Sequence, residues 1–147
     1  MLSGTAIAGR PLGRARLATV EPVLVGRLGK ARLGEPQLCE VDGTTAPLAV
    51  VQHRWPGFTV SYGSSGGTAV AIAWTVSLDK VPDGFTLADG ATWRPGFAEL
   101  RRRPGAEATT VDGRLSVRLP VQRLAFSGPA GASRPDTAAG GVQLRCP

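Results

Sequence analysis

The segment Phe85–Gly105, FTLADGATWRPGFAELRRRPG, constrains the fold most because it has the pattern of a turn followed by a capped helix. Thr92 is of a residue type that caps helix N-termini, and Pro95 falls in the first turn, where its missing amide hydrogen costs nothing. A Pro-Gly pair ends the segment. We expect a helix of about three turns that packs on a sheet through apolar residues at i, i+4 and i+7, namely Trp93, Phe97 and Leu100.

This segment has a fainter copy near the N-terminus. Ala91-Thr92-x-x-Pro95 aligns with Ala18-Thr19-x-x-Pro22, and Val111-Asp112-Gly113 aligns with Val41-Asp42-Gly43. We interpret these matches as two copies of one unit, each a helix followed by strands. Chance alignment of short strings in a chain rich in Ala, Gly, Val and Thr is the alternative.

The clearest strand pattern is Thr68–Leu78, in which small and large apolar residues alternate. We expect a central strand of the sheet, with a small-residue face that lets another layer approach closely. The opposite face would carry the larger side chains of Val70, Ile72, Trp74 and Val76.

The predicted fold class is therefore α+β, with two tandem helix-plus-antiparallel-strand units that form one sheet with the helices packed on one face. Residues 1–17 are expected to be a loose N-terminal arm or a leading strand, residues 18–78 the first unit and residues 79–147 the second, in one compact domain. A chain of 147 residues is long enough for one ordinary core. No apolar run reaches the roughly 18 residues of a membrane span, so no transmembrane segment is expected.

The two cysteines, Cys39 and Cys146, lie far apart and lack the C-x-x-C spacing of zinc or redox sites. We predict a disulfide between them, worth about 4–5 kcal/mol in the chain-entropy model; two buried free thiols are the alternative. A disulfide predicts a secreted or cell-envelope-associated protein. The N-terminal residues lack a signal-peptide pattern. A true start upstream of Met1, or a cytoplasmic protein with free thiols, would explain this.

The formal net charge of +6 comes mostly from arginine, and the abundance of Arg, Ala and Gly favours a GC-rich bacterial source. The densest cluster, Arg101-Arg102-Arg103, would end a helix, where positive charge complements the macrodipole. No nucleic-acid-binding module accompanies the charge. Nucleic-acid binding is therefore kept only as an alternative function.

His53 is the only histidine, and no nucleophile motif accompanies it. We predict no catalytic residue, no cofactor and no metal site, since three scattered His and Cys residues do not suit zinc. The enzymatic alternative is a small hydrolase-like protein in which folding brings a hydroxyl or an acid to His53.

Four residues are the candidates for binding. Trp55 stands just before a Pro-Gly turn at the end of a strand pattern, where an exposed ring could anchor a partner, and Phe58 and Tyr62 alternate on one face of the next strand. Arg134 belongs to Ser127–Gly141, which has the composition of a mobile loop and is longer than its counterpart in the first copy. Trp74 and Trp93 lie on apolar stripes and are expected in the core.

A helix laid on several antiparallel strands and duplicated in tandem resembles the β-lactamase inhibitory protein family and the BamE/SmpA-type envelope lipoproteins. The resemblance is one of layout over most of the chain, with no motif matched residue for residue. In those families the sheet or its loops bind another protein, which implies a role for Trp55, Tyr62 and nearby loops. This chain departs from them in lacking a lipobox cysteine, in having one possible disulfide and in being poor in Tyr and Trp.

The predicted function is that of a non-catalytic extracytoplasmic domain that binds a protein or a cell-envelope component. The sequence predicts neither the identity of that partner nor the oligomeric state.

Overall fold

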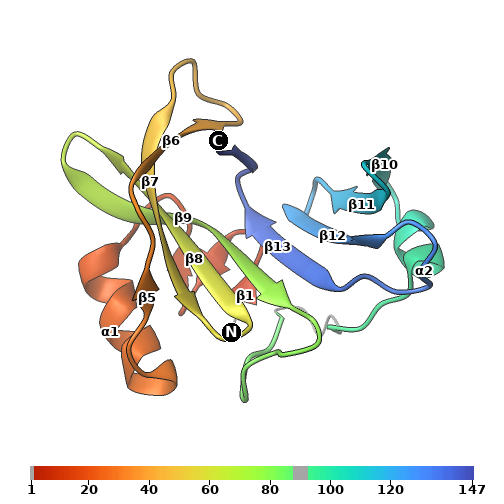
Figure 1. The fold of residues 1–147 in the computed structure, drawn as a ribbon, viewed down its shortest axis with the longest axis horizontal. Coiled ribbons are helices and arrows are strands. Elements are labelled where there is room, and N and C mark those ends of the chain that lie inside the picture. Colours follow the sequence, from red (N-terminus) through yellow and green to blue (C-terminus); the bar gives the residue numbers. More distant parts are fainter. Residues whose placement is uncertain (1, 88–92) are drawn as a thin grey trace.

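A computed structural model describes residues 2–87 and 93–147 and shows a mostly β protein (Figure 1). Its helices in this described part are α1 (Leu17–Leu28) and α2 (Phe97–Arg101). The strands are β1 (Leu2–Ser3), β2 (Ala6–Ile7), β3 (Arg10–Pro11), β4 (Ala15–Arg16), β5 (Arg32–Leu33), β6 (Gln37–Val41), β7 (Leu48–Trp55), β8 (Phe58–Ser65), β9 (Thr68–Ser77), β10 (Glu107–Val111), β11 (Arg114–Leu119), β12 (Leu124–Pro129), β13 (Thr137–Gly141) and β14 (Leu144–Arg145).

Eleven strands form one sheet that consists of two antiparallel meanders. The main path has the order β10-β11-β12-β13-β9-β8-β7-β6-β14, while β4 pairs with β9 and β5 with β7. Strands β6 to β9 are the first meander and β10 to β13 the second. The two meanders meet where β13 pairs with β9, from Thr137 opposite Ser77 to Gly141 opposite Ala73. The segment predicted to be a central strand is therefore central, as β9 is hydrogen-bonded on both edges.

The predicted α+β class with helices packed on one face of the sheet is wrong. Strands dominate, and the second helix has only 5 residues instead of about three turns. The amide of Phe97 donates to the carbonyl of Ser133 at 2.9 Å, so the start of α2 is tied to a distant loop. Gly96 is its N-cap, and Pro95 has no amide hydrogen to donate. The expected cap, Thr92, lies outside the described residues.

Helix α1 begins at Leu17, before Thr19, and its C-cap is Gly29, which has a positive φ of 85°. Thr19 therefore lies inside the helix instead of capping it. Val20 and Leu24 are buried against the sheet. Val41-Asp42-Gly43 and Val111-Asp112-Gly113 do occupy corresponding places, since each closes the first strand of its meander. The internal repeat itself stays a prediction.

Residues 2–16 form four very short strands, of which β1, β2 and β3 make a separate small sheet. Ile7 is fully buried, and the Trp74 indole donates to the Ser3 carbonyl at 2.7 Å. The amide of Leu2 donates to the carbonyl of Thr86. These contacts fix the N-terminal segment against the core. No helix in the described part of the chain is long and apolar enough to cross a membrane.

The main core lies on one face of the sheet. Phe58, Val60, Trp74 and Val76 contribute to it, together with α1, α2 and the N-terminal strands. A register shift between Ser61 and Tyr62 changes the faces expected for β9. Ala71 joins the main core, whereas Ile72 belongs to a small second cluster with Val50 and Cys39.

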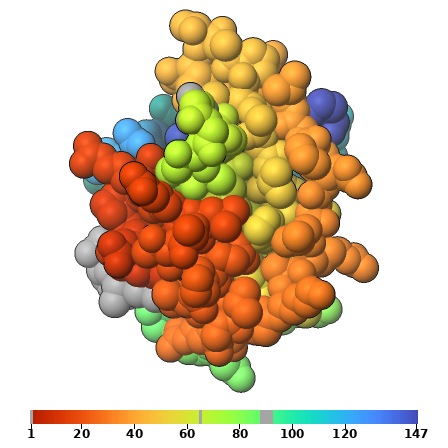
Figure 2. Space-filling view, turned by 90° about the vertical axis from the view of Figure 1, so that its left-hand side faces the viewer, coloured from red at the N-terminus to blue at the C-terminus, as the bar shows by residue number. Residues whose placement is uncertain are grey.

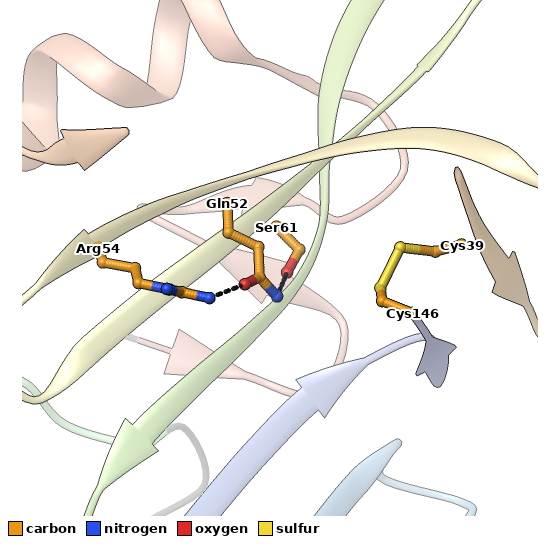
Figure 3. Close-up of a disulfide and its surroundings, with 5 residues drawn as sticks. All are labelled: Cys39, Gln52, Arg54, Ser61 and Cys146. Carbon is orange, nitrogen blue, oxygen red and sulfur yellow. Dashed lines mark hydrogen bonds between the residues drawn. A yellow bond between two sulfur atoms is a disulfide. The ribbon is translucent and has the colours of Figure 1, made fainter. Parts of the chain in front are cut away.

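The first meander is curled and closed by the C-terminus. The chain passes from β13 into β14, and β14 pairs with β6, so one segment joins the last and first strands of this meander. Val142 and Leu144 pack on the second cluster. The predicted disulfide is confirmed, as Cys39 on β6 is bonded to Cys146 just after β14, with a Cα–Cα distance of 4.4 Å (Figure 3). We call residues 142–147 the C-terminal strap.

Candidate functional site

A cleft of about 830 Å³ lies on the face of the sheet opposite the main core. Its floor crosses the junction of the two meanders, and the strap forms one of its walls. The floor carries short side chains from β8, β9, β13 and β12, namely Ser61, Ala73, Thr75, Ala139 and Ala125.

Strand pairing explains why these short side chains share one face. Ser61 is opposite Ala73, Thr75 is opposite Ala139, and Ala139 is in turn opposite Ala125. Because successive residues of a strand point to opposite faces, Trp74 and Val76 point into the core between them. Short side chains on this face leave open the space that longer ones would fill.

Polar groups extend the floor onto the first meander. The Gln52 side chain lies between two partners on the same face (Figure 3). Arg54 donates to the amide oxygen of Gln52 at 2.5 Å, and the amide nitrogen of Gln52 donates to the Ser61 hydroxyl at 3.4 Å. Gln52 and Ser61 both line the cleft. This end of the floor therefore presents an amide and a hydroxyl supported by a guanidinium.

The strap is held against β6 by side-chain charges as well as by the disulfide. Arg145 forms ion pairs with Glu40 at 3.2 Å and with Asp42 at 3.4 Å. The backbone amide of Asp42 donates to the carbonyl of Gln143 at 3.1 Å. The strap is thus fixed at several points along its length.

Gln143 connects the strap to the second meander. With its amide oriented to satisfy both ends, it donates to Asp42 at 3.2 Å and accepts a hydrogen bond from Arg118 Nε at 2.8 Å. Arg118 belongs to β11, and its guanidinium also lies 4.0 Å from Glu107. A chain of polar contacts therefore runs from β6 through the strap to β11 and β10 along the cleft.

Arg123 lines the cleft from the turn before β12. Its side chain is exposed, and it makes no hydrogen bond or ion pair with any described residue. The charged residues of the lining are thus three arginines and one acid, namely Arg118, Arg123, Arg145 and Asp42. The lining thus has more arginines than acids and is rich in hydrogen-bond donors, although Arg118 and Arg145 are ion-paired.

The structure separates the four sequence-predicted binding residues from the cleft. Trp55, Phe58 and Tyr62 are buried in the main core, on the other face of the sheet. The Trp55 indole donates to the carbonyl of Gly29 at the end of α1. Arg134 is exposed, and it donates to the carbonyl of Arg94 at 3.2 Å. None of the four lines the cleft.

Folding does bring an acid to His53. Its Nδ1 lies 2.5 Å from a carboxylate oxygen of Glu21 on α1, and the Tyr62 ring contacts the imidazole edge-on at 4.9 Å. The second oxygen of Glu21 and the Tyr62 hydroxyl are buried, with no hydrogen-bond partner in the described part of the chain. Burial, and then the negative charge of Glu21, raise the pKa of Tyr62.

This buried group lies away from the cleft. His53 alternates with Gln52 along β7 and faces the main core, and it is only 8% exposed. The N-terminal segment and α1 form a continuous surface on that side (red and orange in Figure 2). The arrangement links α1 to the sheet, and the hydrolase-like alternative stays a hypothesis.

Sequence reasoning missed every residue of the cleft. The usable signal is the small-residue face expected on Thr68–Leu78, because Ala73 from that face lies on the floor of the cleft. The interpretation of Ser127–Gly141 as a mobile loop is wrong for Thr137–Gly141, which forms β13 although its Gly and Ala content gives no strand signal. The described residues contain no group of three His, Cys, Asp or Glu placed to hold a metal.

We compared the chain with models of protein families, with curated proteins and with solved structures. None of the three comparisons gave a match. The resemblance in layout to the β-lactamase inhibitory protein family and the BamE/SmpA-type lipoproteins therefore stays a prediction.

Proposed function

We propose that this protein is a non-catalytic, extracytoplasmic binding domain whose ligand occupies the cleft between the two meanders. The observation that carries the proposal is the cleft itself, about 830 Å³ in volume, with short side chains on its floor and polar donors around it. Ligand sites in proteins are typically concavities of roughly 300–1,000 Å³ with a few convergent polar groups. The ligand is a cell-envelope component or a segment of another protein.

The extracytoplasmic location draws support from the disulfide between Cys39 and Cys146. Disulfides persist in oxidising compartments and are rare in the cytosol. Protein isolated without reductant from its native host and then denatured should show no free sulfhydryl on thiol titration. Two free sulfhydryls per chain would remove the argument for export.

An amide-resolved NMR screen tests the cleft. We expect a set of chemically diverse fragments to shift the ¹⁵N–¹H signals of Ala73, Ala125 and Ala139 more than those elsewhere. In the variant Ala139→Trp, a large ring on the floor should abolish these shifts. The control Ala98→Trp places the same ring on the exposed side of α2 and should leave them unchanged.

Fragments that shift signals of the α1 side, or that act equally on Ala139→Trp and the unaltered chain, would contradict the proposal. Both variants must retain the native spectrum outside the substituted region, which the same data report.

A further inference from the structure

We propose that the cleft takes an anionic, hydroxyl-rich ligand, namely a short chain of polyol or sugar units that carries phosphate or carboxylate groups. This inference rests on the proposed function and specifies the chemistry of its ligand.

The charged side chains of the lining indicate an anionic ligand. Three arginines and one acid line the cleft. That acid, Asp42, is already engaged by Arg145 and by Gln143. A ligand cation would therefore find no free carboxylate on the lining. Arg145 and Arg118 are themselves paired with Glu40 and Glu107, so Arg123 is the lining arginine left to meet an anion.

Arg123 is available to bind an anion, because its side chain has no hydrogen-bond or ion-pair partner among the described residues. An arginine presents planar N–H donors that match the oxygens of a carboxylate or phosphate. Arg118 stands on the neighbouring strand of the same wall and keeps one nitrogen on Gln143. A bound anion could bridge these two guanidinium groups.

The neutral polar groups of the floor favour a ligand that carries hydroxyl groups between its anionic groups. Ser61 and Thr75 present hydroxyls, and Gln52 and Gln143 present amides, all of which exchange hydrogen bonds with ligand hydroxyls. Trp74, the only aromatic residue among the described lining, is fully buried. The floor therefore offers no ring on which a neutral sugar could stack, and no aromatic anchor of the kind that dominates protein interfaces. Charge and hydrogen bonding are left as the source of affinity.

The test uses four probes on the intact, disulfide-bonded chain: glycerol-phosphate oligomer, galacturonate oligomer, neutral dextran oligomer and oligoglutamate. Binding is followed by ¹⁵N–¹H shifts of Ala73, Ala125 and Ala139. We expect the first two probes to bind, and their relative affinity shows whether phosphate or carboxylate is preferred. Dextran should not bind, and oligoglutamate should bind more weakly than both charged polyols.

Arginine variants localise the charge effect. Arg123→Gln and Arg118→Gln should each weaken binding about tenfold or more, because each removes a charge-assisted hydrogen bond. Arg101→Gln, on the exposed surface of α2, is the matched control and should change affinity less than about twofold. Raising the salt concentration from about 50 to about 200 mM should weaken binding.

Several results would overturn the inference. Dextran binding as tightly as the charged oligomers would show that charge is irrelevant, and tighter binding of oligoglutamate would assign the cleft to an acidic peptide. If no anionic probe shifts the cleft amides while the fragments of the earlier screen do, the anionic ligand is excluded and the proposed binding site stands. If the fragments fail there as well, the proposed function falls with it.

Discussion

The two faces of the sheet where the meanders join are built from opposite kinds of side chain. On the core face, β9 contributes Trp74 and Val76, both fully buried. On the cleft face, the alternate residues Ala73 and Thr75 are short and line the cleft. The two faces of β9 therefore have different roles: its large apolar side chains stabilise the fold, and its small ones leave room for a ligand.

Removing the disulfide, which fixes the strap at the edge of the cleft, is expected to cause the largest loss of unfolding free energy. The double variant Cys39→Ala/Cys146→Ala should lose about 4–5 kcal/mol of unfolding free energy in the chain-entropy model, measured by urea denaturation. The cysteines are 107 residues apart, so nearly the whole chain is released from its loop. The reduced wild-type chain serves as the control and should behave alike. A loss below about 1 kcal/mol would mean that packing and ion pairs alone hold the strap.

Neighbouring residues of β9 should respond very differently to truncation. Trp74→Ala should cost about 3–5 kcal/mol of unfolding free energy, because it empties a large volume in the core. It also removes the hydrogen bond to Ser3. Thr75→Ala on the cleft face should stay within about 0.5 kcal/mol. Similar costs for the two variants would refute the division of the sheet into a core face and an open face.

The same contrast can be drawn on β13. A Cβ at Gly140 would lie within 2.4 Å of the Trp74 indole, so Gly140→Ala forces the ring or the strand to move. We expect a loss of about 1–3 kcal/mol from this overpacking. Ala139→Ser faces the cleft and should change stability by less than about 0.5 kcal/mol. Thermal denaturation measures the stability of both variants. A Gly140→Ala protein as stable as the wild type would contradict the close contact between Gly140 and Trp74.

The smallest effect is expected from the exposed ion pair between Arg114 on β11 and Asp136, the residue just before β13. Arg114 donates to Asp136 at 2.6 Å, and this hydrogen bond holds the pKa of the Asp136 carboxyl below its usual range. A lowered folded-state pKa adds stability above the ordinary aspartate value of about 3.9, and this contribution disappears as the pH falls through the folded-state value. Because the pair is solvent-exposed, Asp136→Asn should cost at most about 1 kcal/mol at neutral pH.

Urea denaturation at neutral and strongly acidic pH measures this difference between Asp136→Asn and the wild type. The difference should shrink in acid, where Asp136 is protonated. Asp79→Asn, an exposed aspartate without an ion pair in the described part of the chain, is the control. A difference that is the same at both pH values would point to a role of Asp136 other than its charge.

Parts of the fold could be predicted because they depend on neighbouring residues. Asp112-Gly113 makes a tight hairpin turn, with positive φ at both positions, as such turns require. The central place of β9 and the pairing of the only two cysteines were predicted correctly. The faces expected for β9 are correct for Trp74 and Val76 but wrong for Ile72, because of the register shift. The α+β class failed because the segment before α2 is tied to a distant loop through Ser133 instead of continuing as a helix.

The candidate site could not be predicted, because it depends on which face of each strand becomes buried. The alternation placed Phe58 and Tyr62 on one face, but α1, through Val20 and Leu24, makes that face the core. Strand β13 has a sequence of low strand propensity, yet it pairs with β9 and β12. Gly140 suits this position because any larger residue would meet Trp74.

By itself the sequence determined the tight turns, the central strand and the partners of the disulfide, since these follow from local backbone preferences and from having only two cysteines. The tertiary structure alone decided that β9 pairs with β13, that Trp55 and Tyr62 are buried, and that short side chains from four strands form one cleft. The physical reason is that the burial of a side chain is set by the segments that pack over it, and here those segments lie far away in the chain.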